Sequence, residues 1–359
     1  MCTISLCMIV KNEELVLERC LKSVKDLVDE IIIVDTGSED RTKEIAQKYT
    51  KRVYDYPWIN DFSAARNFSF SKADMDYCMW LDADDILLPK DREGLAEIKK
   101  TLLPEADVVM MPYHTNFDGQ GRPIFYCDRE RIIRNRAGFY WEGAVHEVIT
   151  PRGKIAYSPV AITHQKIGPG DLGRNLRIYQ MMLENGVELG PRDQYYYARE
   201  LYDHKLYEKS AAAFETFLNM PKGWVENKIE ACRYLAFCYG VLGDKNAELS
   251  SLFTSFAYDV PRPETCVDIG NFFMGQQRYD VAVFWFHQAL DCPQKETAGF
   301  IMPDCRGYLP CIQLCVCYDK LGDHIKAKYY NDKAGEFKPE APEYLNNKRY
   351  FESLQAQQP

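Results

Sequence analysis

The first half of the chain alternates short, largely apolar runs with amphipathic stretches. Residues 4–10, 31–34 and 77–81 are apolar runs of the length expected for buried strands. After the first run, Leu17, Cys20, Leu21 and Val24 recur at helical spacing. Strands that alternate with helices predict a parallel sheet with helices packed on its faces.

Carboxylates follow two of these predicted strands directly. Asp35 directly follows the run 31–34, and Asp82, Asp84 and Asp85 follow the run 77–81. Open α/β sheets bind ligands at the carboxyl ends of their strands, and a hard divalent cation prefers oxygen ligands. Short acidic turns also occur as solvated loops and helix caps, so this pattern alone is a weak indication of a cation site.

Three ordered segments make the prediction specific: residues 34–40 (VDTGSED), 60–67 (NDFSAARN) and 81–85 (LDADD), with Val145-His146-Glu147 further on. In this order and spacing they resemble family 2 glycosyltransferases with a GT-A fold. Within that family the chain is similar to the bacteriocin S-glycosyltransferases and the lipopolysaccharide-core glucosyltransferases. The resemblance implies an α/β GT-A domain, a Rossmann-like nucleotide-diphosphate-sugar transferase. It also implies inverting transfer of a hexose from a UDP-sugar with Mn²⁺ or Mg²⁺.

The resemblance also assigns residues to the donor. Asp35 is implied to accept hydrogen bonds from the base or ribose, while Gly37 keeps the following turn tight. A turn and helix cap at residues 37–40 is compatible with that role. Arg66 is expected to face the diphosphate or to order the loop that does, since guanidinium matches phosphate geometry; a plain surface cation is the alternative. The full set expected at the donor is Val10, Asn12, Glu13, Asp35, Arg66, Asn67 and Asp82.

The expected metal ligands are Asp84, Asp82 and His164. An apolar stretch leads into His164 before Gly168-Pro169-Gly170 interrupts the pattern. In GT-A enzymes of this kind, a late histidine often completes the shell supplied by the Asp-x-Asp motif. Imidazole suits manganese better than magnesium. His114 is expected to be structural.

Residues 141–147 are expected on the acceptor side. Inverting transfer needs a base that takes the proton of the incoming nucleophile. Glu147 is the first candidate for this catalytic role and His146 the second, and the alternative is that the pair anchors the acceptor loop. Trp141 offers a flat face for a sugar or acceptor side chain, although a core position is equally compatible with the sequence.

After residue 170 the pattern becomes helical and resembles tetratricopeptide repeats, whose helical hairpins span about 34 residues. The predicted crossing positions carry the small residues Ala198, Ala236, Gly270 and Cys315. The predicted turns between paired helices hold Lys205, Gly243, Gly275 and Gly322. The resulting division is a GT-A domain (1–168), a linker helix (169–192), a repeat domain (193–340) and a polar tail (341–359).

Stacked repeats form a groove that suits peptides, so we expect a peptide or protein acceptor to bind there. A role in stability or in a homodimer is the alternative. Two further hypotheses stay open: transfer to a lipid-linked or polysaccharide sugar, and a non-catalytic scaffold that only binds sugar nucleotide.

Composition narrows the class of protein. The 359 residues suffice for two domains, and a net charge of −9 argues against nucleic-acid binding. No apolar run reaches the ~18 residues of a membrane helix, and no cationic leader precedes the first strand, so a cytoplasmic enzyme is expected. The 13 cysteines include no Cys-x-x-Cys pair, which favours reduced thiols. Cys305, Cys311, Cys315 and Cys317 fit helix packing better than zinc.

Overall fold

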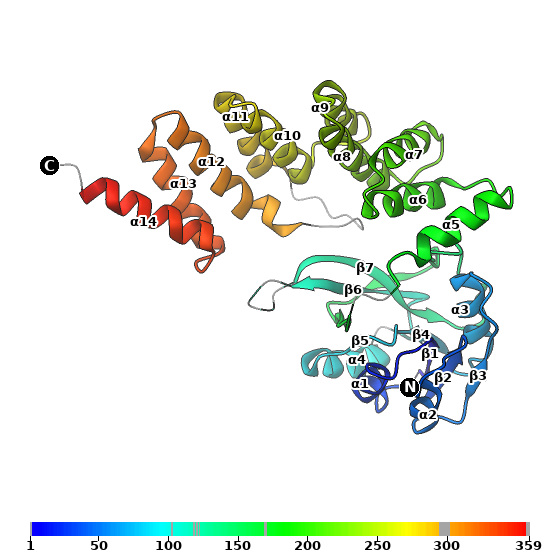
Figure 1. Ribbon diagram of the computed structural model, residues 1–359. Coiled ribbons are helices and arrows are strands. Elements are labelled where there is room, and N and C mark those ends of the chain that lie inside the picture. The colour runs from blue at the N-terminus through cyan, green and yellow to red at the C-terminus, as the bar shows by residue number, and fades with distance from the viewer. Residues whose placement is uncertain are drawn as a thin grey trace. The chain divides into compact units, whose positions relative to one another are not determined.

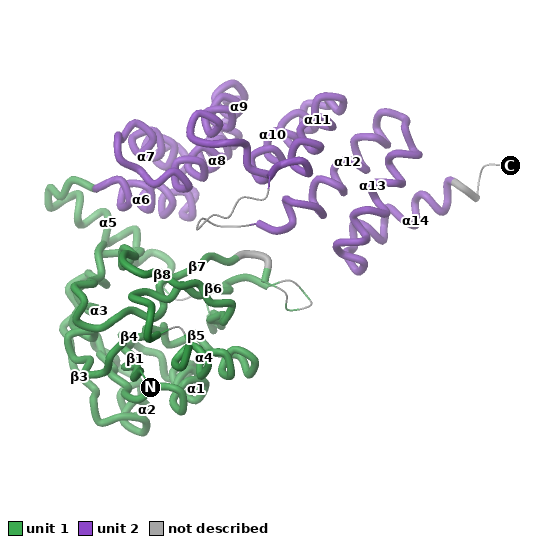
Figure 2. Tube along the Cα trace, turned by 180° about the vertical axis from the view of Figure 1, so that it is seen from behind, with its two compact units in different colours: residues 1–189 green, residues 190–359 purple. Residues whose placement is uncertain are grey.

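The computed structural model describes residues 2–101, 103–117, 119, 121, 123–168, 171–293 and 302–356. The chain divides into two compact units, residues 1–189 and 190–359 (Figures 1 and 2). The predicted linker helix forms as α5 (Arg174–Glu184), and it belongs to the first unit. The boundary therefore lies just before Pro191, which begins the next helix.

The first unit is built on one mixed sheet of nine strands within the described residues. The strand order is β3-β2-β1-β4-β7-β6-β9-β5, and β8 pairs with β6. The first four strands of this order are mutually parallel, whereas β7 runs antiparallel to both β4 and β6. The bounds are β1 (Ile4–Val10), β2 (Glu30–Asp35), β3 (Val53–Asp55), β4 (Tyr77–Trp80), β5 (Asp85–Ile86), β6 (Val108–Phe117), β7 (Pro123–Arg134), β8 (Ile155–Tyr157) and β9 (Ile162–His164).

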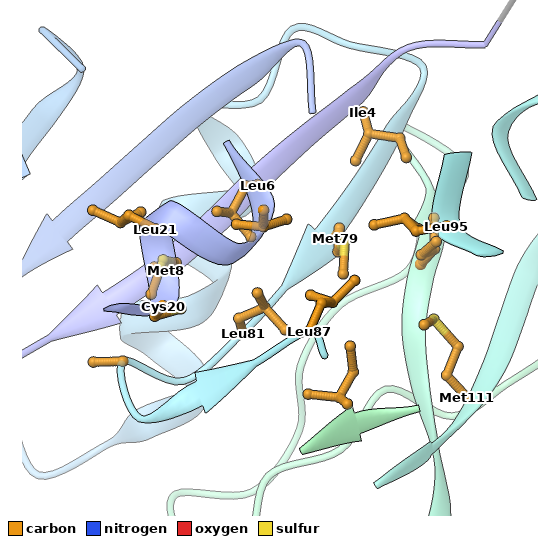
Figure 3. Packing of buried hydrophobic residues seen from close by; sticks show 14 of the residues in the cluster. Ile4, Leu6, Met8, Cys20, Leu21, Met79, Leu81, Leu87, Leu95 and Met111 are labelled. Atoms are coloured by element: carbon orange, nitrogen blue, oxygen red, sulfur yellow. The ribbon is translucent and has the colours of Figure 1, made fainter. Parts of the chain in front are cut away.

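Side chains alternate along β1, so the two faces of the sheet bury different sets of residues. Ile4, Leu6 and Met8 point into the larger core, where they meet Leu21 from one helix and Leu95 from another (Figure 3). Cys7 points to the opposite face, where it packs with Ile32, Ala73 and Cys78. The helices of this unit before α5 are α1 (Leu17–Val24), α2 (Thr42–Gln47), α3 (Phe62–Ser71) and α4 (Pro89–Thr101). Alternate residues of β1 and residues spaced by one helical turn in the helices thus pack in one core.

The strand register brings the sequence motifs to one edge of the sheet. Val10 lies opposite Asp35 at the carboxyl ends of β1 and β2. The chain then returns through β6, β7 and β9, and β9 pairs with the short β5, which places His164 opposite Asp85. Residues 79 positions apart are therefore neighbours beside the acidic loop.

The second unit is a series of antiparallel helical hairpins, as the tetratricopeptide pattern predicts. Its helices are α6 (Pro191–Asp203), α7 (Tyr207–Asn219), α8 (Val225–Leu242), α9 (Lys245–Thr254), η1 (Ser255–Ala257), α10 (Pro263–Gly275), α11 (Tyr279–Asp291), η2 (Pro303–Arg306), α12 (Tyr308–Lys320), α13 (His324–Phe337) and α14 (Pro342–Ala356). At Gly270 an added Cβ would lie 2.5 Å from the ring of Phe286, so the crossing of α10 and α11 requires a residue without a side chain.

One predicted turn residue differs from the structure. The turns after α6, α8, α10 and α12 contain residues with left-handed φ: Lys205 at 59°, Gly243 at 84°, Gln277 at 61° and Gly322 at 82°. In the third turn this residue is Gln277, whereas Gly275 is the last residue of α10. The third turn keeps the left-handed conformation although Gln277, like Lys205 in the first turn, is not a glycine, the residue that favours it.

The expected polar tail also differs from the structure, because α14 extends to Ala356. Phe351 is 4% exposed and packs with Cys315 and Ala327, which gives this helix an apolar anchor. In the part of the chain that the structure describes, no helix combines the length and apolarity needed to cross a bilayer. The 13 cysteines are all free thiols, and ten of them are buried.

Candidate active site

Asp35 ends β2 with one oxygen bonded and the other unpaired. Its Oδ1 accepts hydrogen bonds from the backbone N–H groups of Gly37 (2.9 Å) and Ser38 (2.8 Å). Its Oδ2 is buried and has no hydrogen-bond partner among the described residues. Buried carboxylate oxygens rarely stay without a donor, so this oxygen is available to one from a ligand.

Asn12 links the loops that follow β1 and β2. Its φ of 56° is left-handed, a conformation that asparagine tolerates better than most residues. The Asn12 N–H donates to Ser38 Oγ (2.9 Å), and its Oδ1 accepts from the Glu39 N–H (2.8 Å). Val10 closes β1 beside this connection, and its carbonyl accepts from the Thr36 N–H at 2.9 Å. Of the expected donor residues, Val10 and Asn12 thus shape the loop beside Asp35.

Asp84, Asp85 and His164 form a cluster that could hold a metal ion. One ligand atom from each lies within 4.8 Å of the others. His164 Nδ1 lies 3.3 Å from both Asp84 Oδ1 and Asp85 Oδ1. Burial by itself lowers the pKa of His164, but the hydrogen bonds and charges of the two carboxylates raise it to about 10. The structure therefore brings together the predicted ligands Asp84 and His164 and adds Asp85, which the sequence analysis did not assign.

Asp82 faces a different partner. Its Oδ1 accepts from Arg66 Nη2 at 2.7 Å, while Arg66 Nε donates to Glu147 Oε1 at 2.5 Å. Burial acts to raise the pKa of Asp82, yet the positive charges of Arg66 and Arg131 lower it to about 2. Arg66 thus bridges the acidic loop after β4 and the predicted acceptor loop.

Three arginine side chains pack around the ring of Trp80, the last residue of β4. The guanidinium carbons of Arg66, Arg129 and Arg131 lie 4.9, 5.0 and 3.7 Å from the centre of its ring. Trp141 packs edge-on against Trp80 with ring centres 5.0 Å apart, and it is 2% exposed. Of the two interpretations of Trp141, the core position is the observed one.

Residues 141–147, the predicted acceptor loop, are held to α3 by three contacts. The Asn67 side chain exchanges two hydrogen bonds with the Trp141 backbone, at 2.9 and 2.8 Å. The Phe62 N–H donates to the Ala144 carbonyl at 2.9 Å, and Arg66 holds Glu147. Asn67, expected at the donor, is engaged with this loop. His146 adopts a left-handed φ of 51°, a strained conformation that concentrates at functional sites.

Negative charge accumulates at this edge of the sheet. Burial, and after it the charges of Asp84, Asp82 and Asp40, raise the pKa of Glu13 to about 7. A bound cation would offset this repulsion.

His114 was expected to be structural, and its ring packs against Tyr126 with ring centres 5.7 Å apart.

The sequence motifs include most of the residues that meet here, but not the residues that pack behind them. Tyr113, Arg129 and Arg131 lie on the hairpin of β6 and β7, and they carry no motif. For the two arginines the available signal was the charged run Asp128–Arg131 before an apolar pair, because a charged residue within a buried strand must be paired.

Comparison with known proteins identifies the first unit. Residues 5–146 match the family model described as "Glycosyl transferase family 2". Residues 5–146 are a family 2 glycosyltransferase domain. The match begins within β1 and ends at His146, so it covers every motif of the site except Glu147 and His164.

Several curated proteins are similar to parts of this chain. A TPR repeat-containing protein from Synechococcus elongatus is 39% identical over 150 residues, which cover 42% of this chain and 36% of the relative. The prophage-derived glycosyltransferase SunS of Bacillus subtilis is 26% identical over 290 residues, 75% of this chain and 65% of the relative. LpsC of Rhizobium meliloti, a lipopolysaccharide core biosynthesis glycosyltransferase, is 29% identical over 156 residues, 40% of this chain and 56% of the relative. The chain therefore spans less than two thirds of each of these proteins.

The Arg66 bridge generates a stability prediction. Arg66→Leu should lower the free energy of unfolding by about 3–5 kcal/mol, because it leaves two carboxylates near tryptophan rings without their counter-charge. Urea unfolding followed by tryptophan fluorescence measures the change. Arg41→Leu, which removes an exposed pair with Glu44, is the matched control and should cost less than about 1 kcal/mol. Equal losses in the two variants would contradict the role given to Arg66.

Proposed function

We propose that this chain is an inverting, metal-dependent glycosyltransferase that moves a hexose from a UDP-sugar to a peptide or protein acceptor. One observation carries the proposal. The Asp84–Asp85–His164 cluster and the unpaired Asp35 oxygen lie at strand ends on the same edge of the sheet, in a unit that contains a family 2 glycosyltransferase domain. A diphosphate sugar needs both features, a cation for its phosphates and an acceptor for its nucleoside.

The side chains of the Asp84–Asp85–His164 cluster fit a divalent cation. Carboxylates and one imidazole suit Mn²⁺ or Mg²⁺ better than a thiophilic metal. Asp84 and His164 would hold the ion, with Asp82 beside them, and the ion would stabilise the departing diphosphate. Glu13 and Asp40 add to the negative charge that favours a cation here. Asp35 would accept a hydrogen bond from the base or ribose.

The remaining chemistry falls to the Arg66–Glu147 pair and its neighbour. Arg66 is buried between Asp82 and residues 141–147, so it would order the loop beside the diphosphate while keeping Glu147 in place. Glu147 is the first candidate for the base that receives the acceptor proton, and His146 the second. The strained backbone of His146 supports a functional role for this loop.

The repeats of the second unit support a protein acceptor. Stacked helical hairpins present a continuous surface whose occupants in other repeat proteins are peptides. The relative LpsC favours the alternative, a lipid-linked or polysaccharide sugar, because its name places it in lipopolysaccharide core biosynthesis. Mass spectrometry of candidate acceptors after incubation with UDP-hexose separates the two proposals.

The cation prediction uses release of UDP from UDP-sugar. Asp84→Asn should cut Mn²⁺-dependent release about 100-fold or more, since the amide is a poor ligand for a hard cation. Asp26→Asn is the control, because this carboxylate is exposed and remote in sequence from the motifs. Full activity of Asp84→Asn in the presence of a chelator would overturn metal dependence.

A second prediction separates base from anchor. Glu147→Gln keeps an oxygen that Arg66 can bond but removes the base, so turnover should fall about 100-fold while UDP affinity stays unchanged. Glu147→Ala also removes the anchor and should weaken UDP binding. If Glu147→Gln turns over normally, Glu147 serves only to hold Arg66, and His146 becomes the candidate base.

The third prediction concerns the repeats. A fragment of residues 1–189 keeps the whole first unit, including α5, and should retain UDP binding and slow donor hydrolysis. Transfer to a protein acceptor should fall about 100-fold or more, because the binding energy of the repeats is lost. Circular dichroism and UDP titration establish that the fragment is folded. A folded fragment that transfers at the full rate would assign the repeats to stability or assembly.

A further inference from the structure

Tyr113 stands behind the cluster that could hold the cation. Its hydroxyl donates to Asp85 Oδ1 at 2.9 Å and lies 2.9 Å from His164 Nδ1. Its ring meets the imidazole edge-on, with centres 5.7 Å apart and planes at 69°. One side chain therefore contacts two of the three members of the cluster.

Asp85 differs from Asp84 in its surroundings. Its side chain has no exposure, and both oxygens have donors from the protein. Oδ2 accepts from the Asp82 N–H (3.1 Å) and from Arg131 Nη1 (3.0 Å), while Oδ1 faces Tyr113 and His164 Nδ1. Arg131 is itself fully buried between Trp80 and Tyr113. Asp85 thus belongs to a buried Tyr113–Asp85–Arg131 network and supports the cluster from inside the domain.

Nδ1 is the nitrogen of His164 that would hold the cation, because it is the one that lies beside the carboxylates. Nδ1 lies 3.3 Å from Asp84 Oδ1. Neighbouring ligands of an octahedral ion with bonds of about 2.1 Å are separated by about 3 Å, so the two atoms are close to the spacing that one ion requires. A nitrogen that ligates a metal cannot also carry a proton. If Nδ1 held the ion, Asp85 Oδ1 would lose His164 as a hydrogen-bond donor.

We infer that Tyr113 is a positioning residue of the cation site. Its hydroxyl keeps one hydrogen bond on Asp85 Oδ1, which would remain if His164 gave up its own bond to hold the ion, and its ring packs edge-on against the imidazole. Without this hydroxyl, cation binding leaves a fully buried carboxylate oxygen with no donor, and the free energy of that loss is subtracted from the affinity. The inference rests on the proposed function, because it concerns the cation of the same site.

The experiment measures Mn²⁺ binding by the full-length protein with saturating UDP, from the electron paramagnetic resonance of free Mn²⁺. Tyr113→Phe should raise the Mn²⁺ dissociation constant about 10–100-fold, the range for residues that support metal ligands. His164→Ala should raise it at least as much. The double variant should bind no more weakly than His164→Ala alone, because Tyr113 acts through His164.

Tyr77→Phe is the matched control. It also removes a buried tyrosine hydroxyl of the same sheet, but that hydroxyl donates to the backbone carbonyls of Leu103 and Ala106. It should leave the Mn²⁺ dissociation constant unchanged even if it lowers stability. Asp85→Asn provides a second route should Tyr113→Phe fail to fold, and it is expected to weaken Mn²⁺ binding at least tenfold.

The outcomes separate the inference from the proposed function. A wild-type protein that binds no Mn²⁺ overturns the cation of the proposed function, and Tyr113 loses its role with it. Tight binding by wild type and weak binding by His164→Ala, with Tyr113→Phe unchanged, overturns the inference alone. So does a double variant in which the two losses add, or an Asp85→Asn protein that binds Mn²⁺ as tightly as wild type.

Discussion

The balance of buried charge around Trp80 is the constraint on which this site depends. Carboxylates at the edge of a sheet repel one another, and burial makes each charge more costly. Here three guanidinium groups surround one indole ring and pair with Asp82, Asp85, Glu130 and Glu147. The arginines offset the carboxylates that face inward, which leaves Asp84 and the second oxygen of Asp35 available to ligands.

This arrangement divides the acidic run 82–85 into different tasks. Asp82 is bonded to Arg66, Asp84 faces the cluster with His164, and Asp85 is enclosed by Tyr113 and Arg131. Four consecutive residues at the end of a strand turn in different directions, so similar side chains meet different surroundings. Proximity in sequence therefore does not give the three aspartates a common function.

Local patterns were sufficient to predict the strands β1, β2 and β4, the repeats, and the meeting of Asp84 with His164. These follow from apolar periodicity and from motifs that lie at strand ends. Tyr113 and Arg131 could not be predicted, because their contacts depend on how the hairpin of β6 and β7 registers against β4. Gln277 was missed for another reason: a left-handed glutamine has no propensity signal when a glycine lies two residues away. Among the described side chains of α14, only Phe351 is buried, and it anchors a segment whose composition is polar.

The ties between α3 and the acceptor loop have a consequence for how such enzymes can diversify. Phe62, Arg66 and Asn67 each hold a different point of residues 141–147. The pairs Asn67–Trp141 and Arg66–Glu147 are 74 and 81 positions apart in the sequence, yet their hydrogen bonds join the two segments, so neither can be exchanged between relatives alone. A chimaera that takes this loop from a relative would need residues 60–67 and 141–147 together, on an otherwise unchanged sheet.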